Sequence, residues 1–299
     1  MEKQGKGLIA VDGGATKTDL VLFQEDGTVI RRLIGGPSNS SEIGFEQSVT
    51  TLEALLRSLV PQNDFTDAIG AIHLGLAGGG IAPNQIRYQQ FLQDRFHGVH
   101  HLGNGSDAIN ALNAGLPSGD GMVLIAGTGS AVFVRAGDTM HQVGGWGHLL
   151  GDEGSGYDIG RMGLRRVLQE LDGRLPATSL SPLLCQAIGR PVDEAIPDLY
   201  RGGKRLIASL APLVFEAAAS GDAAAREILR ESARQLSLLI QAGSRHLSQP
   251  PYLVVLSGSL WQANDGLLEN LVFAQLDESY RTIHPRLPPV YGSAVAAMN

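Results

Sequence analysis

The chain has 299 residues, a formal net charge of −7 and a hydrophobic fraction of 43%. This length is enough for two domains with a large core, and the ordinary hydrophobic fraction excludes an intrinsically disordered chain. An acidic chain without a basic run repels nucleic acids and anionic membranes, so we expect neither as a partner. The single cysteine, Cys185, excludes a disulfide framework or a cysteine-based zinc cluster within one chain.

The sequence contains no visible targeting or membrane segment. Its start, MEKQGKGLIAVDGG, has no long apolar stretch of the kind that a signal peptide needs. No run of about 18 uninterrupted apolar residues occurs, so no membrane span is predicted. We therefore expect a cytoplasmic protein.

The first part of the chain predicts a mixed sheet with helices. Residues 7–36 predict three short strands, because a glycine-rich turn and then the hairpin signal Asp26-Gly27 separate apolar runs. Strands joined by such short turns are antiparallel. Apolar residues three and four positions apart then predict a helix over residues 45–59. The remaining elements of this part are a buried strand at 68–78, a helix at 85–96, a short strand at 99–102 and a helix opening at 106–112, which gives the order βββαβαβα.

The same unit then begins again. IAVDGGATKTDLVLF and VLIAGTGSAVFV both read as strand, glycine turn and strand, and HQVGGW follows the second as a third strand. Such a repeat predicts two related domains that face each other across a cleft. The remaining elements expected are helices at 155–171, 206–220 and 223–247, a buried strand in YLVVLSGSL, and a closing helix at 294–298.

The domain boundary is predicted in LPSGDG, residues 116–121, which is rich in turn-forming residues. The N-terminal domain then covers residues 1–117 and the C-terminal domain residues 118–287. We expect the last helix, residues 288–299, to pack back onto the N-terminal domain.

The first hairpin, AVDGGATKTDL, is a candidate phosphate site. Asp12 ends its first strand, and Gly13, Gly14, Ala15 and Thr16 follow in the turn. Small residues let backbone amides approach a phosphate and form an anion nest, and the Thr16 hydroxyl adds a donor. Asp12 could hold Mg²⁺ through water, because Mg²⁺ favours carboxylates and keeps several waters. The alternative is a plain β-hairpin with permissive glycines.

The second hairpin, IAGTGSAV, offers the same backbone donors at Gly127, Thr128, Gly129 and Ser130, without a carboxylate. Alone it is best explained as an ordinary turn. Two such hairpins, one in each half, favour a nucleotide whose phosphates are held from both sides.

The segment HLGNGSDAINAL contains Gly103, Gly105 and Ala108, a G-x-G-x-x-A match expected between a strand and a helix. A lone match to this dinucleotide fingerprint is weak, and here three antiparallel strands precede it. Asp107 stands near the helix N-terminus, where its charge is stabilised. It is therefore either a capping residue or a base at the mouth of the cleft.

The segment GGWGHLLGDEGSGYDIG combines an aromatic side chain, bendable backbone and two carboxylates. Trp146 could stack on a sugar face and Asp152 could accept hydrogen bonds from sugar hydroxyls. The alternatives are core packing for Trp146 and a first-turn acid pair for Asp152 and Glu153.

Two further loops could contribute to a ligand site. Asn39, in PSNSS, could form hydrogen bonds with a polar ligand or could simply be part of a turn. Gly258 and Ser259, in LSGSLW, could lie against an adenine ring or form a tight strand-to-helix turn.

Other chemistries lack their motifs. There is no G-x-x-x-x-G-K-[ST], since GGKRL fails its last position, and neither H-E-x-x-H nor G-x-S-x-G occurs. His97, His100 and His101 cluster, but an exposed helix end and strand explain them better than a metal site.

DGGATKT, GTGS, SDA, GGWGHLLGDEGSGY and LSGSLW, in this order, resemble the BadF/BadG/BcrA/BcrD group of the actin–hexokinase–Hsp70 superfamily, and within it the N-acetylglucosamine kinases. The resemblance spans nearly the whole chain, and GGWGHLLGDEGS is its most specific part. It implies an α/β fold of two ribonuclease-H-like (actin-like ATPase) domains, each a mixed βββαβαβα sheet with helices on both faces, with ATP in the cleft between them.

The resemblance also implies roles for individual residues. The nucleotide phosphates and adenine are implied to contact Asp12, Gly13, Gly14, Thr16, Lys17, Thr128, Gly129, Gly258, Ser259 and Gln262. The sugar is implied to contact Asn39, Asp107, Ser130, Gly145, Trp146, Gly147 and Asp152. Asp107 is implied as the base, and Asp12 as the Mg²⁺ ligand through water.

Two departures from the family pattern concern these sites. Ala15 replaces the usual third glycine of the first hairpin, and Gly105-Ser106 replaces the more common polar pair before Asp107. The related glucosamine kinases lack the tryptophan–glycine pair after GG, which by analogy favours an N-acetylated sugar.

The implied reaction is ATP- and Mg²⁺-dependent phosphorylation of N-acetylglucosamine at its 6-hydroxyl by a cytoplasmic homodimer. Glucosamine or glucose as the substrate is the first alternative. The second is an ATPase activator, whose relatives carry an iron–sulfur cluster on cysteines, a motif that Cys185 does not match. The third is a non-catalytic sugar sensor, but the first strand at about Leu8 leaves no room for a DNA-binding module.

Overall fold

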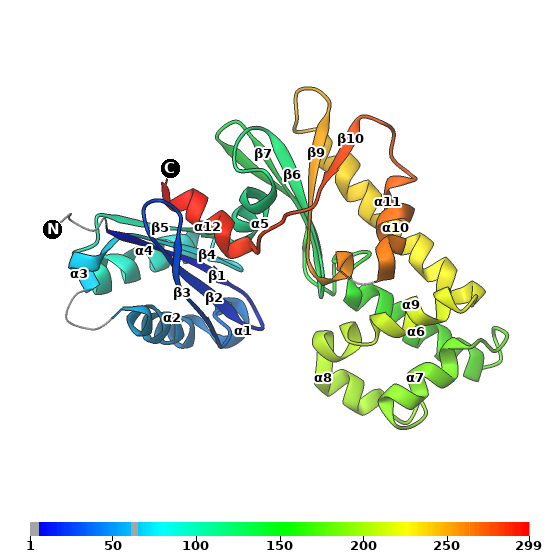
Figure 1. Cartoon of the computed structure of the whole chain (residues 1–299). Coiled ribbons are helices and arrows are strands. Elements are labelled where there is room, and N and C mark those ends of the chain that lie inside the picture. Colours follow the sequence, from blue (N-terminus) through cyan, green and yellow to red (C-terminus); the bar gives the residue numbers. More distant parts are fainter. Residues whose placement is uncertain (1–5, 61–64, 263, 299) are drawn as a thin grey trace. The chain divides into compact units, whose positions relative to one another are not determined.

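The computed structural model describes residues 6–60, 65–262 and 264–298. They form two compact units, each a sheet with helices packed on it (Figure 1). Unit 1 comprises Met1–Ser118 and His284–Asn299, and unit 2 comprises Gly119–Ile283.

Unit 1 is built on a five-stranded mixed sheet with the strand order β3-β2-β1-β4-β5. β1 pairs antiparallel with β2, which pairs antiparallel with β3, whereas β4 runs parallel to both β1 and β5. The strands are β1 (Gly7–Gly13), β2 (Thr18–Phe23), β3 (Val29–Gly35), β4 (Ile69–Leu76) and β5 (His101–Ser106). The helices are α1 (Ser40–Ile43), α2 (Phe45–Leu59), α3 (Phe65–Ala68), α4 (Ala82–Phe96), α5 (Asp107–Gly115) and α12 (Pro289–Met298).

Helices cover both faces of this sheet, because alternate residues of a strand point to opposite faces. Ile9 and Val11 of β1 belong to the larger core that α2 and α4 close. Leu8 and Ala10 face the other way and pack with Val290 and other residues of α12. In α2, the helical spacing of apolar residues buries Leu52, Leu56 and Leu59 against the sheet, as the sequence predicts.

Unit 2 repeats this topology. Its strand order is β10-β9-β6-β7-β8, which read from β8 is the order of unit 1. β6, β7 and β8 are antiparallel neighbours, and β9 is parallel to both β6 and β10. The strands are β6 (Gly121–Ala126), β7 (Ser130–Ala136), β8 (Thr139–Gly144), β9 (Tyr252–Ser257) and β10 (Tyr280–Ile283). The duplicated βββαβ unit predicted from the two glycine hairpins is therefore confirmed.

The helices of unit 2 differ most from those of unit 1. They are α6 (Gly156–Leu171), α7 (Leu180–Ile188), α8 (Ile196–Ala208), α9 (Ala211–Ala219), α10 (Ala223–Ser244) and α11 (Leu267–Phe273), with short 3₁₀ turns η1 (Ser259–Trp261) and η2 (Asn264–Gly266). Their apolar faces form one core with Met122, Leu124 and Ala126 of β6.

Several predicted boundaries are wrong. The strand predicted at 99–102 is β5, which runs from His101 to Ser106, so Gly103 and Gly105 lie within a strand and not in a phosphate turn. The helix predicted at 206–220 is divided at Ser209–Leu210 between α8 and α9. α7, α11 and β10 were not predicted, and α12 begins at Pro289, before the predicted 294.

α12, the last described helix, packs on β1, β4 and α5 of unit 1. Gly292 permits this close approach, since a Cβ there would lie 1.9 Å from the Asn110 carbonyl oxygen. Ser293 Oγ accepts the Val11 amide at 3.3 Å and lies 2.9 Å from Nδ1 of buried His73. Among the described helices, none combines the length and the apolar character that a bilayer crossing requires.

Candidate functional site

Asp12 and Asp107 lie at the same edge of the unit 1 sheet. Asp12 is near the end of β1, and Asp107 directly follows the end of β5. β1 and β5 are both parallel to β4, where Gly75 is in register with Asp12 on one side and with Gly105 on the other. The carboxyl ends of these strands therefore meet at one edge, the usual place of a site in such a sheet.

The Asp12 carboxylate has few compensating charges. Burial is the main cause that raises its pKa to about 7, and the negative charges of Asp107 and Asp19 raise it further. Asn110 and Lys17 act in the opposite direction. Asp19 itself is neutralised by Arg32, whose Nε and Nη2 lie 2.9 and 2.5 Å from its two oxygens.

Asn110 holds Asp12 in place, although the sequence analysis did not single it out. Its Nδ2 donates to Asp12 Oδ1 at 2.8 Å and also lies 3.2 Å from the Val11 carbonyl and 3.3 Å from the Gly75 carbonyl. Asn110 is completely buried. The available signal was an amide side chain one turn after Asp107 in the mostly apolar helix DAINALNAG.

Asp107 occupies the first position of α5, and Ser106 is the N-cap, whose side chain accepts from the Ala108 amide. Burial is the main cause that raises the pKa of Asp107, while hydrogen bonds from Ser106 and from backbone amides lower it. The capping role therefore belongs to Ser106, which leaves the Asp107 carboxylate for another task.

The first glycine hairpin joins the same edge. The Gly14 amide donates to the Lys17 carbonyl at 2.9 Å, and the Gly14 carbonyl accepts from the Asn39 amide at 3.3 Å. A Cβ at Gly13 would lie 2.2 Å from Ser38 Oγ, whereas one at Gly14 would meet only ordinary contacts. Gly13 is therefore fixed by packing, not by backbone conformation.

The other predicted residues of unit 1 lie in this hairpin or next to it. Thr16 and Lys17 are exposed at its tip. Asn39 is the N-cap of α1, and its Oδ1 accepts from the Ser41 amide at 3.0 Å. Unit 1 thus brings together Asp12, Gly13, Gly14, Asn39 and Asp107.

In unit 2, the second hairpin opens onto a pocket of about 620 Å³. Gly127 and Thr128 line the pocket together with Ser259, which follows the neighbouring parallel strand β9. A Cβ at Gly127 would lie 3.4 Å from Ser259 Oγ. Gly258 has a φ of 110°, and a Cβ there would lie 2.2 Å from the Ala126 carbonyl oxygen, so this turn needs glycine.

The remaining walls of this pocket come mainly from α8 and α9. From the sequence, residues 206–220 could line either the nucleotide site or a dimer interface. The lining from these helices and the segment between them includes Arg205, Ser209, Pro212, Phe215, Glu216 and Ala219. Gln262, a predicted adenine contact, is not among the lining residues. The volume and the mixture of apolar and polar walls suit a nucleoside.

Trp146 is not a core residue. Its side chain is 67% exposed and follows β8 in a loop where Gly144, Gly145 and Gly147 all have positive φ. A Cβ at Gly145 would lie 2.8 Å from the Ala131 Cβ. Core packing, one of the two interpretations of Trp146, is thus excluded.

Asp152 is a buried carboxylate on strained backbone. It is 4% exposed and has a φ of 58°, which L-residues other than asparagine and aspartate rarely adopt. Its Oδ1 accepts from the Ser130 amide at 3.3 Å, and its Oδ2 lies 2.8 Å from the Lys204 ammonium. Non-glycine residues held in such conformations cluster at functional sites.

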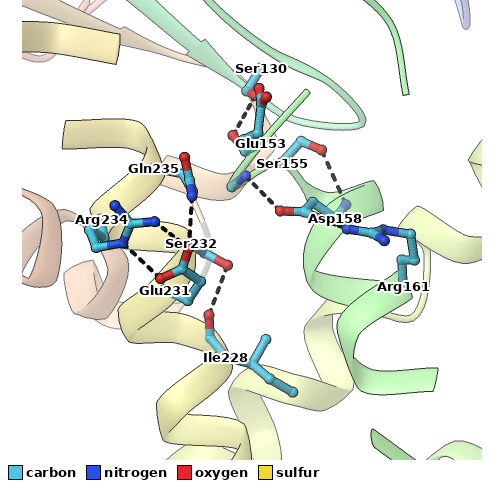
Figure 2. Close-up of polar contacts among 11 residues, drawn as sticks. Ser130, Glu153, Ser155, Asp158, Arg161, Ile228, Glu231, Ser232, Arg234 and Gln235 are labelled. Carbon is cyan, nitrogen blue, oxygen red and sulfur yellow. Dashed lines mark hydrogen bonds and ion pairs between the residues drawn. The ribbon is translucent and has the colours of Figure 1, made fainter. Parts of the chain in front are cut away.

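Asp152 and Glu153 do not form the first-turn acid pair of α6. Ser155 is the N-cap, and its Oγ accepts from the Asp158 amide at 3.2 Å, while Asp158 Oδ2 accepts from the Gly154 amide at 3.0 Å. Figure 2 shows this cap beside Ser130, whose hydroxyl donates to the Glu153 carbonyl at 2.7 Å. Ser130 therefore ties the second hairpin to the Asp152 segment.

A larger pocket, of about 680 Å³, lies in unit 1 but contains none of the predicted site residues. It surrounds the start of β1 and the end of β2, including Leu8, Phe23 and Tyr291, at the opposite end of β1 from Asp12. Among the described residues, no three His, Cys, Asp or Glu side chains converge as a metal cluster.

Comparison with known proteins places this arrangement in a family. Residues 9–297 match the BadF/BadG/BcrA/BcrD ATPase family. The chain belongs to this family. The match covers both units, as the resemblance of the ordered motifs predicts.

Several relatives span nearly the full chain. An N-acetylmuramic acid/N-acetylglucosamine kinase of Clostridium acetobutylicum is 30% identical over 95% of this chain and 92% of its own length. An N-acetyl-D-glucosamine kinase of Dictyostelium discoideum is 29% identical over 97% of each chain. A solved structure from Chromobacterium violaceum, provisionally described as an N-acetylglucosamine kinase, has a TM-score of 0.76 and 26% identity and covers 97% of this chain and 98% of its own. These matches confirm the two-domain actin-like fold.

Proposed function

We propose that this protein is an ATP-dependent amino-sugar kinase that phosphorylates the 6-hydroxyl of N-acetylglucosamine and releases ADP. The observation that carries this proposal is that the second hairpin borders both the pocket of unit 2 and the buried Asp152. Gly127 and Thr128 line the pocket of nucleoside size, and the next residue, Gly129, packs against the buried Asp152. Family membership supports ATP as the phosphoryl donor.

In this proposal the nucleoside occupies the unit 2 pocket, and the polyphosphate extends over the amides of Thr128 and Gly129, because the Gly127 amide donates to the Gly129 carbonyl at 2.9 Å. Pro212 and Ala219 offer apolar contacts to a base, and Ser259 offers polar groups. Thr128, which is exposed at the hairpin tip, presents a hydroxyl and an amide. Backbone amides are suitable phosphate donors because they carry no competing side chain.

Asp152 and Trp146 are assigned to the sugar. A buried carboxylate whose two oxygens are held by the Ser130 amide and the Lys204 ammonium has the fixed direction needed to accept sugar hydroxyls, and the exposed indole ring offers a flat apolar surface. N-acetylglucosamine is the proposed substrate because the names of two relatives include it. N-acetylmuramic acid, which the name of the Clostridium relative also includes, is the second candidate for the same site.

In unit 1, Asp107 is proposed as the base that accepts the proton of the 6-hydroxyl. Burial raises its pKa, which makes this carboxylate a stronger base than an aspartate in water. Phosphoryl transfer depends mostly on positioning and charge neutralisation, so a modest base is sufficient.

Asp12 is proposed to hold Mg²⁺ through water. The fit rests on its chemistry, because a half-buried carboxylate that the Asp107 charge disfavours gains from a divalent cation, and Asn110 fixes one of its oxygens. Mg²⁺, when bound, would neutralise charge on the phosphates of ATP.

The test is ADP release by the purified protein with Mg-ATP and one sugar at a time. N-acetylglucosamine, N-acetylmuramic acid, glucosamine, glucose and a sugar-free sample are compared at equal concentration. Fast release with N-acetylglucosamine and mass-spectrometric detection of its 6-phosphate support the proposal. Preference for glucosamine contradicts the assigned substrate, sugar-independent release indicates an ATPase activator, and no release with any sugar contradicts kinase activity.

A further inference from the structure

Lys204 is a residue that neither the motifs nor the proposed catalytic roles include. It is the only lysine of unit 2, and every arginine-or-lysine position of that unit other than this one is an arginine. Its ammonium lies 2.8 Å from Asp152 Oδ2, and its side chain is 33% exposed. Lysine differs from arginine in having a compact charge on a flexible stem, which can change partners without losing a fixed fork of hydrogen bonds.

A break in α8 places Lys204 beside Asp152. Gly203, the preceding residue, has a φ of 57° and a ψ of −150°, which are not helical values. This conformation directs the chain after the break toward the second hairpin. Arg205, the following residue, lines the nucleoside-sized pocket. The break therefore presents consecutive side chains to two neighbouring parts of one site.

Lys204 also touches the hairpin that is proposed to hold phosphate. A Cβ at Gly129 would lie 3.0 Å from the Lys204 ammonium and 2.9 Å from Asp152 Oδ1. The cation thus stands between a carboxylate assigned to the sugar and backbone assigned to the nucleotide. A polyphosphate on the amides of Thr128 and Gly129 would bring several negative charges close to this ammonium.

We propose that Lys204 is a positioning residue that pairs with Asp152 in the absence of nucleotide and turns to the polyphosphate when ATP binds. The exchange frees Asp152 Oδ2 to accept a sugar hydroxyl, so bound nucleotide tightens sugar binding. This inference rests on the proposed kinase function. Its physical basis is that a polyphosphate carries more negative charge than one carboxylate and therefore competes with Asp152 Oδ2 for the ammonium.

The direct test observes the lysine itself. Reductive methylation with ¹³C-formaldehyde keeps the positive charge of each lysine and gives one signal per lysine, and the chain has only four: Lys3, Lys6, Lys17 and Lys204. Lys204→Arg identifies the Lys204 signal by its loss. Magnesium and a non-hydrolysable ATP analogue are expected to shift this signal, while AMP, which lacks the β- and γ-phosphates, leaves it in place. Lys6, which donates to the Thr66 carbonyl at 3.1 Å, is the internal control.

The second test measures coupling by calorimetry. We expect the ATP analogue to lower the dissociation constant of N-acetylglucosamine at least about five-fold in the native protein, and Lys204→Met to abolish this effect. Arg201→Met is the matched control, because it removes an exposed cation from the same helix, where Arg201 pairs with Asp198. It should keep the native coupling.

The outcomes separate this inference from the kinase proposal. If the native protein binds the analogue but the Lys204 signal does not move, or if Lys204→Met keeps the full coupling, the exchange is wrong and the kinase proposal stands. If the native protein binds no analogue at all, both are wrong. Because the labelling test keeps Lys204 and its positive charge in place, it decides the matter even if Lys204→Met does not fold.

Discussion

Gly75 and Asn110 fit together so closely that a Cβ on Gly75 would lie 2.1 Å from both side-chain Oδ1 and Nδ2 of Asn110. Gly75 is in register with Asp12 across the β1–β4 pairing. The missing side chain on β4 gives Asn110 of α5 room to reach the carboxylate of Asp12. A glycine in one strand thus positions a proposed metal ligand in its neighbour.

Replacing Asn110 should therefore lower activity by more than the loss of folded protein explains. In Asn110→Ala, loss of the hydrogen bond to Asp12 raises the pKa of Asp12 further and removes its fixed orientation. A hydrogen bond to a charged group contributes about 1.5–3 kcal/mol, so we expect kcat/KM for Mg-ATP to fall by a factor on the order of 10 to 100.

Asn113→Ala is the matched control for this substitution. Asn113 lies one turn further along α5, is also buried, and donates to the Gly292 carbonyl at 3.3 Å instead of to Asp12. Both variants should lose stability, measured by urea unfolding, but only Asn110→Ala should lose activity beyond the change in folded fraction. Equal losses of activity would contradict a specific role for Asn110.

The pKa of Asp12 predicts how stability depends on pH without magnesium. Its folded pKa of about 7 lies above its unfolded value of 3.8, so the folded state binds more protons between these values. The contribution of Asp12 to stability is therefore complete below about pH 4 and is lost as the pH rises through 7. Asp12→Asn should flatten this part of the profile, measured by urea unfolding from pH 4 to 8.

Magnesium should restore part of the stability that is lost as the pH rises. A cation near Asp12 favours its ionised form, so binding should release protons and should strengthen as the pH rises toward 8. Calorimetric titration of Mg²⁺ in buffers of different ionisation enthalpy measures the release. Proton release that persists unchanged in Asp12→Asn would show that the metal binds elsewhere.

Asp107→Asn should abolish phosphoryl transfer while leaving nucleotide binding nearly intact. General base catalysis contributes about 10²- to 10⁴-fold, and the amide cannot accept the proton. Single-turnover transfer to N-acetylglucosamine and calorimetry with an ATP analogue measure the two effects. Asp94→Asn, a change in α4 on the exposed surface, is the control. Normal turnover in Asp107→Asn would exclude Asp107 as the base.

Trp146→Ala should weaken sugar binding and should change little else. Since the side chain is 67% exposed, its loss should change the free energy of unfolding by less than about 0.5 kcal/mol. We expect KM for N-acetylglucosamine to rise about ten-fold while KM for ATP stays unchanged. Leu149→Ala removes another exposed apolar side chain, 82% exposed, from the same loop and should not reproduce the change.

Gly129→Ala tests whether the second hairpin serves both ligands. The new methyl group would press on Asp152 Oδ1 and on the Lys204 ammonium, which lie 2.9 and 3.0 Å from the Cβ position. Both nucleotide and sugar affinities should fall. Gly127→Ala meets Ser259 Oγ at an ordinary 3.4 Å and should weaken only nucleotide binding. Loss of one ligand alone in Gly129→Ala would argue against a shared hairpin.

Some features are determined by the sequence alone, because they depend on neighbours along the chain. Alternating apolar runs around glycine turns predict the three antiparallel strands of each unit, and the spacing of Leu52, Leu56 and Leu59 predicts α2. The order of five short motifs was sufficient to identify the family. The local sequence pattern did not predict features that depend on packing, such as the break before Lys204 and the division between α8 and α9.

Only the tertiary structure decided which partners the polar residues take. Asn110 reaches Asp12 across a gap of 98 positions, and Lys204 reaches Asp152 across 52. Sequence pattern could not choose between core packing and exposure for Trp146, because three positive-φ glycines around it set the path of the loop. Local motifs indicate most of the candidate site residues, whereas Asn110, Lys204 and the hydrogen bonds of the site appear only when distant elements pack together.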